Sequence, residues 1–164
     1  MTETDRHARN ATRLSELYPT FRARIAAVIA ALEAEGYRPR IQDAWRSVAD
    51  QLAAYKSGHS KLRYGFHNVT AQDGTPEALA VDLIDDDHPL ASAPAYLIRL
   101  AAYARAHGLV TGILWGLTGK VRAATDSAIG LGYKDAAVKI GWDPTHVEPT
   151  GLTAAEAGYG KRPA

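Results

Sequence analysis

The chain has no cysteine, only one methionine and two phenylalanines, and no long apolar run. The absence of cysteine excludes disulfides, thiolate zinc sites, iron–sulfur clusters and cysteine nucleophiles, so a metal site must use nitrogen and oxygen ligands. The longest apolar run, residues 25–32, is far shorter than the roughly 20 residues of a membrane-spanning helix, and we expect no membrane insertion. The polar start lacks the apolar segment of a signal peptide, which predicts synthesis in the cytoplasm.

Neither sign of charge dominates. Lysine and arginine number 19 against 18 aspartates and glutamates, a net charge of +1, which argues against nucleic acid as a partner. The length of 164 residues, with 46% hydrophobic and 23% charged residues, is typical of one globular domain.

The apolar pattern predicts helices mixed with short strands, which is the α+β class. Leu17, Phe21, Ile25, Val28 and Leu32 share one face of a helix that Gly36 ends. Further helices are expected after Ser47 and Pro94. Extended segments are expected over residues 37–45, 79–84, 109–115 and 140–148, a long loop over 58–76, a flexible start over 1–12 and a C-terminal tail over 151–164. Residues 116–139 are ambiguous.

The segment from Trp142 to Glu148 contains a first candidate for chemistry. On an extended strand His146 and Glu148 face the same side, and Asp143 lies three residues before His146. A zinc hydrolase needs three protein ligands and a carboxylate near its water, so His146 can supply a ligand and Asp143 the carboxylate. The alternative is a turn built on Asp-Pro-Thr beside a histidine that is merely hydrogen-bonded.

His67 and Asp82 provide the other candidate ligands. His67 lies in the polar loop, and Asp82 stands between Val81 and Leu83 in an apolar strand, where a carboxylate is costly to bury unless it is paired or binds a metal. Alternatively, Asp82 points to the solvated face of that strand. Asp73 is a competing carboxylate ligand, although Gly74 after it favours a turn.

Three further polar groups are candidates for a functional role. Arg46 precedes a helix cap, and its guanidinium can hold a carboxylate or a developing oxyanion, whereas a surface salt bridge is the commoner fate of an arginine. His59 could line a cleft, although a loop histidine is usually just solvated. The acidic run over residues 85–87 predicts a solvated loop.

Four of these segments, in order, resemble one family, the zinc peptidases that include D-alanyl-D-alanine carboxypeptidases, D,D-dipeptidases and phage L-alanyl-D-glutamate endopeptidases. The resemblance spans residues 40–148. The matching segments are Arg46-Ser47 with Gln51, Leu52 and Tyr55; His67 with Ala80-Val81-Asp82; Leu114-Trp115-Gly116; and Asp143-Pro144-Thr145-His146. The stretch between His67 and Asp82 is longer than is usual in that family.

The resemblance implies a zinc peptidase domain over residues 13–150, with helices packed on an antiparallel sheet and one Zn²⁺ per chain on the sheet's open face. It implies that His67, Asp82 and His146 are the zinc ligands. Asp143 would be the general base, Arg46 would hold the oxyanion or a carboxylate, and Gln51 and Trp115 would contact substrate.

The implied substrate is the peptide stem of peptidoglycan, cleaved as a carboxypeptidase or an endopeptidase by a monomer. The small size and the polar start favour a phage or prophage lysin that reaches the cell wall after release. Two alternatives stay open: a zinc-containing cell-wall or peptide binding module without catalysis, and a scaffold without metal, which would leave Asp82 unexplained.

Overall fold

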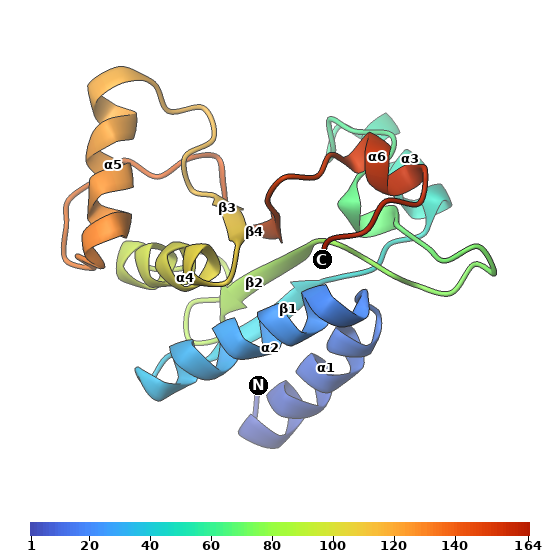
Figure 1. The fold of residues 1–164 in the computed structure, drawn as a ribbon. Coiled ribbons are helices and arrows are strands. Elements are labelled where there is room, and N and C mark those ends of the chain that lie inside the picture. Colours follow the sequence, from blue (N-terminus) through green and yellow to red (C-terminus); the bar gives the residue numbers. More distant parts are fainter.

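The computed structural model describes all 164 residues and shows helices packed on a four-stranded antiparallel sheet (Figure 1). The strands lie in the order β1-β2-β4-β3, and every neighbouring pair is antiparallel. The predicted α+β class and antiparallel sheet are therefore confirmed. The strands are β1 (Pro39–Asp43), β2 (Val81–Asp85), β3 (Leu109–Gly112) and β4 (Asp143–Pro149). The helices are α1 (Glu3–Ser15), α2 (Pro19–Ala34), α3 (Val48–Lys56), the short 3-10 turn η1 (Phe66–Asn68), α4 (Pro94–Ala106), α5 (Gly119–Leu131) and α6 (Ala154–Gly158).

The hydrophobic core lies between one face of the sheet and helices α2 and α4. The predicted apolar face of α2 is confirmed, since Phe21 and Ile25 are fully buried in the same core as Val81 and Leu83 of β2. Side chains alternate along a strand, so Asp82 points to the opposite face. None of the helices combines the length and the hydrophobicity that crossing a bilayer requires.

Residues 1–12 do not form the flexible start that the sequence predicts, because most of them belong to helix α1, which lies along the edge strand β1. Asn10 acts there as a substitute for a neighbouring strand. Its side-chain amide donates to the carbonyl of Pro39 at 3.0 Å and accepts from the backbone N–H of Ile41 at 2.8 Å. Arg9 donates to the carbonyl of Ile41 at 2.9 Å. The polar residues that suggest a solvated segment instead satisfy the open edge of the sheet.

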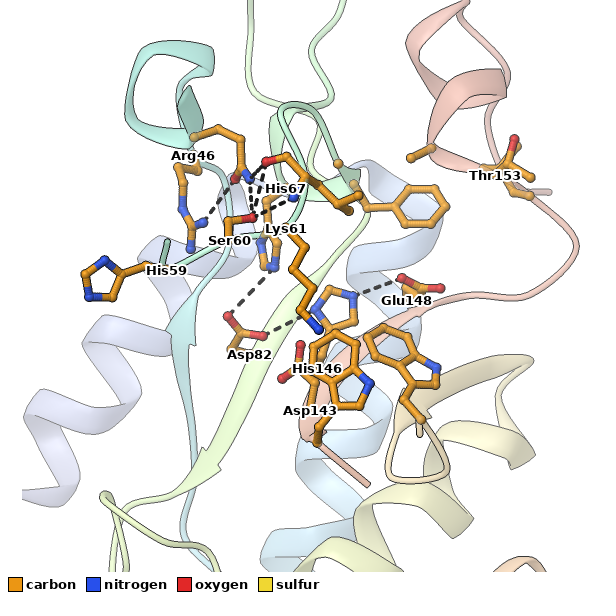
Figure 2. A pocket seen from close by; sticks show the side chains of 18 of the residues that line it. Arg46, His59, Ser60, Lys61, His67, Asp82, Asp143, His146, Glu148 and Thr153 are labelled. Atoms are coloured by element: carbon orange, nitrogen blue, oxygen red, sulfur yellow. Dashed lines mark hydrogen bonds and ion pairs between the residues drawn. The ribbon is translucent and has the colours of Figure 1, made fainter. Parts of the chain in front are cut away.

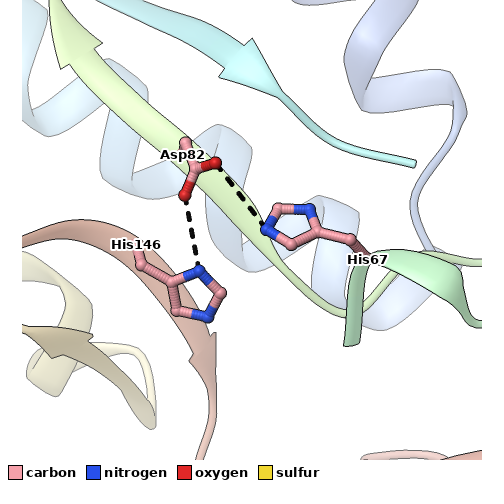
Figure 3. A group of neighbouring side chains, drawn as sticks. All are labelled: His67, Asp82 and His146. Carbon is pink, nitrogen blue, oxygen red and sulfur yellow. Dashed lines mark ion pairs between the residues drawn. The ribbon is translucent and has the colours of Figure 1, made fainter. Parts of the chain in front are cut away.

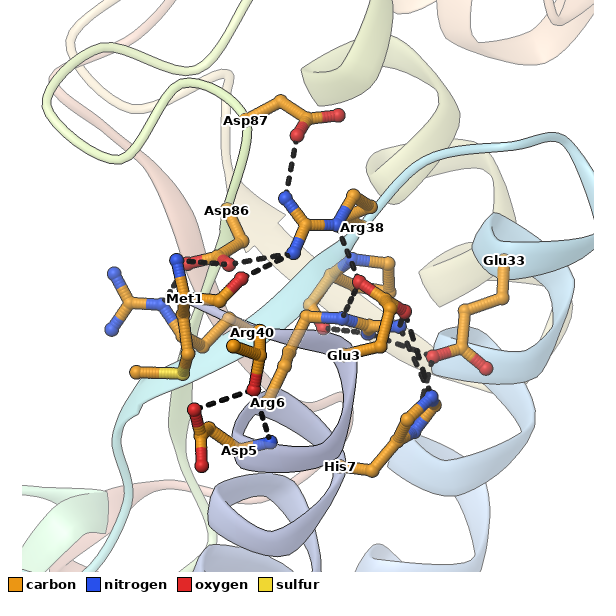
Figure 4. A network of polar contacts seen from close by, with 12 residues as sticks. Met1, Glu3, Asp5, Arg6, His7, Glu33, Arg38, Arg40, Asp86 and Asp87 are labelled. Atoms are coloured by element: carbon orange, nitrogen blue, oxygen red, sulfur yellow. Dashed lines mark hydrogen bonds and ion pairs between the residues drawn. The ribbon is translucent and has the colours of Figure 1, made fainter.

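The acidic run 85–87 is only partly the solvated loop that the sequence predicts, since Asp87 is exposed in a turn after β2 but its two neighbours are buried. Asp86 is buried, and its carboxylate is 2.7 Å from Arg40 Nε and 3.3 Å from an Arg38 nitrogen (Figure 4). Arg38 also pairs with Asp87 at 2.7 Å. These ion pairs join the end of β2 to β1, which explains how an acidic cluster can be tolerated inside the fold.

Two other segments contain helices that the sequence did not predict. Helix α5 occupies most of the ambiguous stretch 116–139. The segment over 151–164 folds back on the domain through helix α6, with Ala157 buried and Arg162 donating to Glu77 at 2.9 Å. The C-terminal residues are therefore part of the packed domain and reach the cleft described below.

The contact between α1 and β1 leads to a stability prediction. Asn10→Ala should lower the free energy of unfolding by about 1–3 kcal/mol, because the buried N–H of Ile41 loses its acceptor. Thr12→Ala is the matched control, since the Thr12 hydroxyl is exposed and bonds only to a carbonyl of its own helix. Denaturant unfolding measures both variants. Equal unfolding midpoints for the two would contradict the role given to Asn10.

Candidate active site

A cleft of about 790 Å³ opens on the face of the sheet opposite the helical core. Its walls come from the ends of β2 and β4, the loop after α3, the turn η1 and the segment before α6 (Figure 2). The seven residues for which the sequence predicts a role all line this one cleft, namely Arg46, Gln51, His67, Asp82, Trp115, Asp143 and His146. Residues far apart in the sequence are thus brought to one place.

Strand register brings Asp82 and His146 together. The two residues are direct partners across the antiparallel pair β2–β4, so their side chains leave the same face of the sheet. Asp82 Oδ1 is 3.4 Å from His146 Nδ1, and Asp82 Oδ2 is 3.8 Å from His67 Nε2 (Figure 3). One ligand atom from each of the three residues lies within 4.8 Å of the others, close enough to hold one metal ion.

His67 is oriented by the backbone around it. Its Nδ1 is 2.5 Å from the carbonyl oxygen of Ala44, which assigns the proton to Nδ1 and directs the lone pair of Nε2 toward Asp82. The turn η1 is fixed in turn by Asn68, whose side-chain amide donates to the carbonyl of Arg46 at 2.8 Å. The imidazole is therefore held as a metal ligand needs to be.

His146 has a corresponding partner in Glu148. The Nε2 of His146 is 2.9 Å from a carboxylate oxygen of Glu148, so Nε2 donates and Nδ1 faces Asp82. The sequence placed Glu148 on the same side of the strand as His146 but gave it no role. The two-residue spacing of His146 and Glu148, which puts both side chains on one face of a strand, is the feature of the sequence that could have indicated this contact.

The charges of the site favour a cation between the carboxylates. Burial lowers the pKa of His67, which keeps that imidazole neutral. Burial also acts to lower the pKa of His146, but hydrogen bonds with Asp82 and Glu148 outweigh it and raise that pKa to about 9. Two carboxylates thus stabilise positive charge at this position. Two imidazoles and one carboxylate are a donor set that suits zinc and leaves a fourth position open.

Asp143 supplies a free carboxylate in the same cleft. It starts β4 opposite Gly112, where the two backbones approach so closely that a Cβ on residue 112 would lie 2.1 Å from the Asp143 carbonyl oxygen. Its carboxylate forms no hydrogen bond or ion pair within the chain, and burial raises its pKa. Such a group can accept a proton more readily than a paired carboxylate can.

Arg46 lines the cleft and is held by two residues of the chain. It forms an ion pair with Asp43, and its Nη1 donates to Gln51 Oε1 at 3.0 Å. Arg46 therefore forms the salt bridge that was the alternative to a functional role, but it does so while lining the cleft. The sequence predicts no role for Asp43, because its distance from Arg46 along the chain does not by itself indicate an ion pair.

Gln51 has little capacity left for a direct contact with substrate. It is 4% exposed, it accepts from Arg46, and its amide nitrogen donates to Ser60 Oγ at 2.8 Å and to the carbonyl of Leu62 at 2.7 Å. The geometry makes Gln51 a link between Arg46 and the loop after α3.

Two tryptophans form an aromatic wall beside the ligands. The ring of Trp115 is 5.3 Å from that of His146 and 5.1 Å from that of Trp142, centroid to centroid. Trp142 remains 62% exposed at the edge of the cleft. Trp115 is one of the residues predicted to contact substrate, whereas no role is predicted for Trp142.

The competing candidates lie apart from the three-residue group. His59 lines the cleft, but its Nδ1 is 2.8 Å from the hydroxyl of Ser57. Asp73 is exposed and accepts from the backbone N–H of Thr75, which lowers its pKa. Within the long stretch between His67 and Asp82, a bridge between Thr70 and Pro76 closes a short loop, and Figure 1 shows this loop projecting from the domain.

No protein-family model and no curated protein matches the chain. Among solved structures, that of the L-Ala D-Glu endopeptidase ChiX from Serratia marcescens is similar, with a TM-score of 0.49 and 21% sequence identity over 87% of each chain. At this identity the likeness concerns the fold alone. The activity must therefore be inferred from the residues of the site.

Proposed function

We propose that the chain is a zinc-dependent peptidase that hydrolyses a peptide bond of the peptidoglycan stem. The observation that carries the proposal is the group of His67, Asp82 and His146, with the unpaired carboxylate of Asp143 in the same cleft. The choice of the stem peptide as substrate comes from the sequence resemblance to the zinc peptidases of the cell wall.

The three ligands would hold one zinc ion, each with the geometry already described. When bound, zinc lowers the pKa of a water molecule toward about 7 and polarises a carbonyl group. Ala44 and Glu148 keep the two imidazoles in the tautomers that binding requires. Each imidazole ligand is thus supported by a second contact, and such contacts commonly affect metal affinity by about 10–100-fold.

Asp143 and Arg46 supply the chemistry of the chain itself. Asp143 accepts a proton from the attacking water as the new C–O bond forms, and returns it to the leaving amine as the C–N bond breaks. Arg46 contributes positive charge where the carbonyl oxygen becomes negative, or holds a neighbouring carboxylate of the substrate. Asp43 and Gln51 fix the direction in which this guanidinium points.

A digest of purified stem peptides tests the proposal. We expect cleavage that a chelator abolishes, and the product masses distinguish a D-Ala–D-Ala carboxypeptidase from an L-Ala–D-Glu endopeptidase. Absence of cleavage by the zinc-loaded protein would reject the peptidase. A role as a phage lysin is the finer part of the proposal, and lysis of purified cell walls tests it.

A further inference from the structure

Lys61 is a cation in the cleft to which the proposed chemistry gives no role. It belongs to the loop between α3 and η1, and its side chain extends from that loop over the cleft (Figure 2). Its Nζ lies 5.1 Å from the ring centroid of Trp142, within the range of a cation–π contact. The exposed indole therefore holds the ammonium group at the edge of the cleft.

Lys61 has no carboxylate partner, in contrast to the other cation of the cleft. Arg46 is paired with Asp43. The carboxylates of Asp82 and Glu148 are engaged with histidines, and Asp143 forms no ion pair with Lys61. Lys61 is thus a cation of the cleft whose charge is not paired within the chain.

The loop that carries Lys61 is anchored on both sides of it. The backbone N–H groups of His59 and Ser60 donate to the carbonyl of Ala54 at 2.9 and 3.1 Å. On the other side, the buried amide of Gln51 donates to the carbonyl of Leu62 at 2.7 Å. The backbone position of Lys61 is therefore set by the fold.

A short series of rings relates Lys61 to the metal ligands. Its ammonium contacts Trp142, Trp142 lies 5.1 Å from Trp115, and Trp115 lies 5.3 Å from His146. An extended peptide advances about 3.3–3.6 Å per residue. A peptide whose reacting bond lies at the ligands therefore reaches Lys61 within a few residues.

We propose that Lys61 binds a carboxylate of the peptide substrate, so that the cleft selects peptides with a free carboxylate close to the cleaved bond. The inference rests on the proposed function, because it takes a peptide as the occupant of the cleft. The free carboxylates of a lysine-type stem pentapeptide, L-Ala–γ-D-Glu–L-Lys–D-Ala–D-Ala, are those of glutamate and of the C-terminal alanine. Lys61 would recognise one of the two.

Binding measurements with three forms of this pentapeptide test the inference. One form has both carboxylates free, one has the glutamyl carboxylate as an amide, and one has the C-terminus as an amide. Calorimetry with zinc-loaded Asp143→Asn protein gives affinities without turnover. We expect one of the amides to bind about fivefold more weakly than the free acid, which is the upper range for an exposed ion pair.

Variants of the loop separate the role of Lys61 from a general effect of charge. In the same background, Lys61→Met should bind all three forms equally, and Lys61→Arg should keep the preference. Arg63→Met is the matched control, because Arg63 lies in the same loop but over Tyr55, outside the cleft. It should leave the preference unchanged.

The results separate the two proposals. Equal binding of all three forms, a preference that survives in Lys61→Met, or no binding of any form would overturn the role of Lys61. A Lys61-dependent preference in a wild-type protein that cleaves none of the peptides would keep this role and reject the peptidase.

Discussion

Alanine at His67, Asp82 or His146 is expected to remove the bound zinc and with it the hydrolysis of stem peptides. Each residue contributes one of three ligand atoms that lie within 4.8 Å of one another. Because even the loss of a group that only supports a ligand costs about 10–100-fold in metal affinity, the loss of a direct ligand should cost more than about 100-fold. Metal analysis after dialysis, together with competition against a chromophoric chelator, measures the effect.

Two variants in the neighbouring loops serve as controls. His59→Ala removes another histidine from the same cleft, and Asp73→Ala removes the competing carboxylate at the projecting loop. Both should keep stoichiometric zinc. Circular dichroism should show that all five variants are folded. If Asp82→Ala kept its zinc while Asp73→Ala lost it, the carboxylate ligand would have been assigned to the wrong residue.

Asp143→Ala is expected to retain the zinc and to lower kcat by about 100-fold to 10,000-fold, the usual contribution of a general acid–base residue. The carboxylate of Asp143 is not engaged with any other side chain, so its removal leaves the three ligands and their partners intact. Steady-state kinetics on the stem peptide, with metal analysis of the same sample, measures both quantities.

The conservative replacements at this position sharpen the test. Asp143→Asn preserves the shape but cannot accept a proton, so it should be as slow as the alanine variant. Asp143→Glu keeps a carboxylate and should recover part of the rate. Full hydrolysis by Asp143→Ala would exclude the residue as the base. A binding module without catalysis would bind the peptide equally well with aspartate or alanine and show no turnover with either.

The sequence was informative where local pattern and long-range position agree. Asp82 between two apolar strand residues was conspicuous because a carboxylate there needs a partner, and the register of β2 against β4 places His146 directly opposite it. The resemblance of four segments to the zinc peptidases predicted which side chains would share a site. The sheet then brought them together.

The sequence was misleading where a polar residue finds its partner through tertiary packing. Asn10 and Asp86 lie in polar segments that suggested solvated chain, but Asn10 binds the edge of β1 and Asp86 pairs with Arg40 of the same strand. The bond between Arg46 and Asp43 was missed for the same reason. Such pairings depend on how the elements pack, and no local spacing predicts them.

The most direct test of the central claim is a zinc titration of activity. The protein is stripped with a chelator, dialysed and returned to the stem peptide with increasing amounts of zinc, while mass spectrometry follows the products. We expect no cleavage without metal and a rate of cleavage that rises until one zinc per chain has been added, whereas His67→Ala should show no cleavage over the same range. Cleavage that persists in the stripped protein, or a protein that binds one zinc and cleaves nothing, would contradict it.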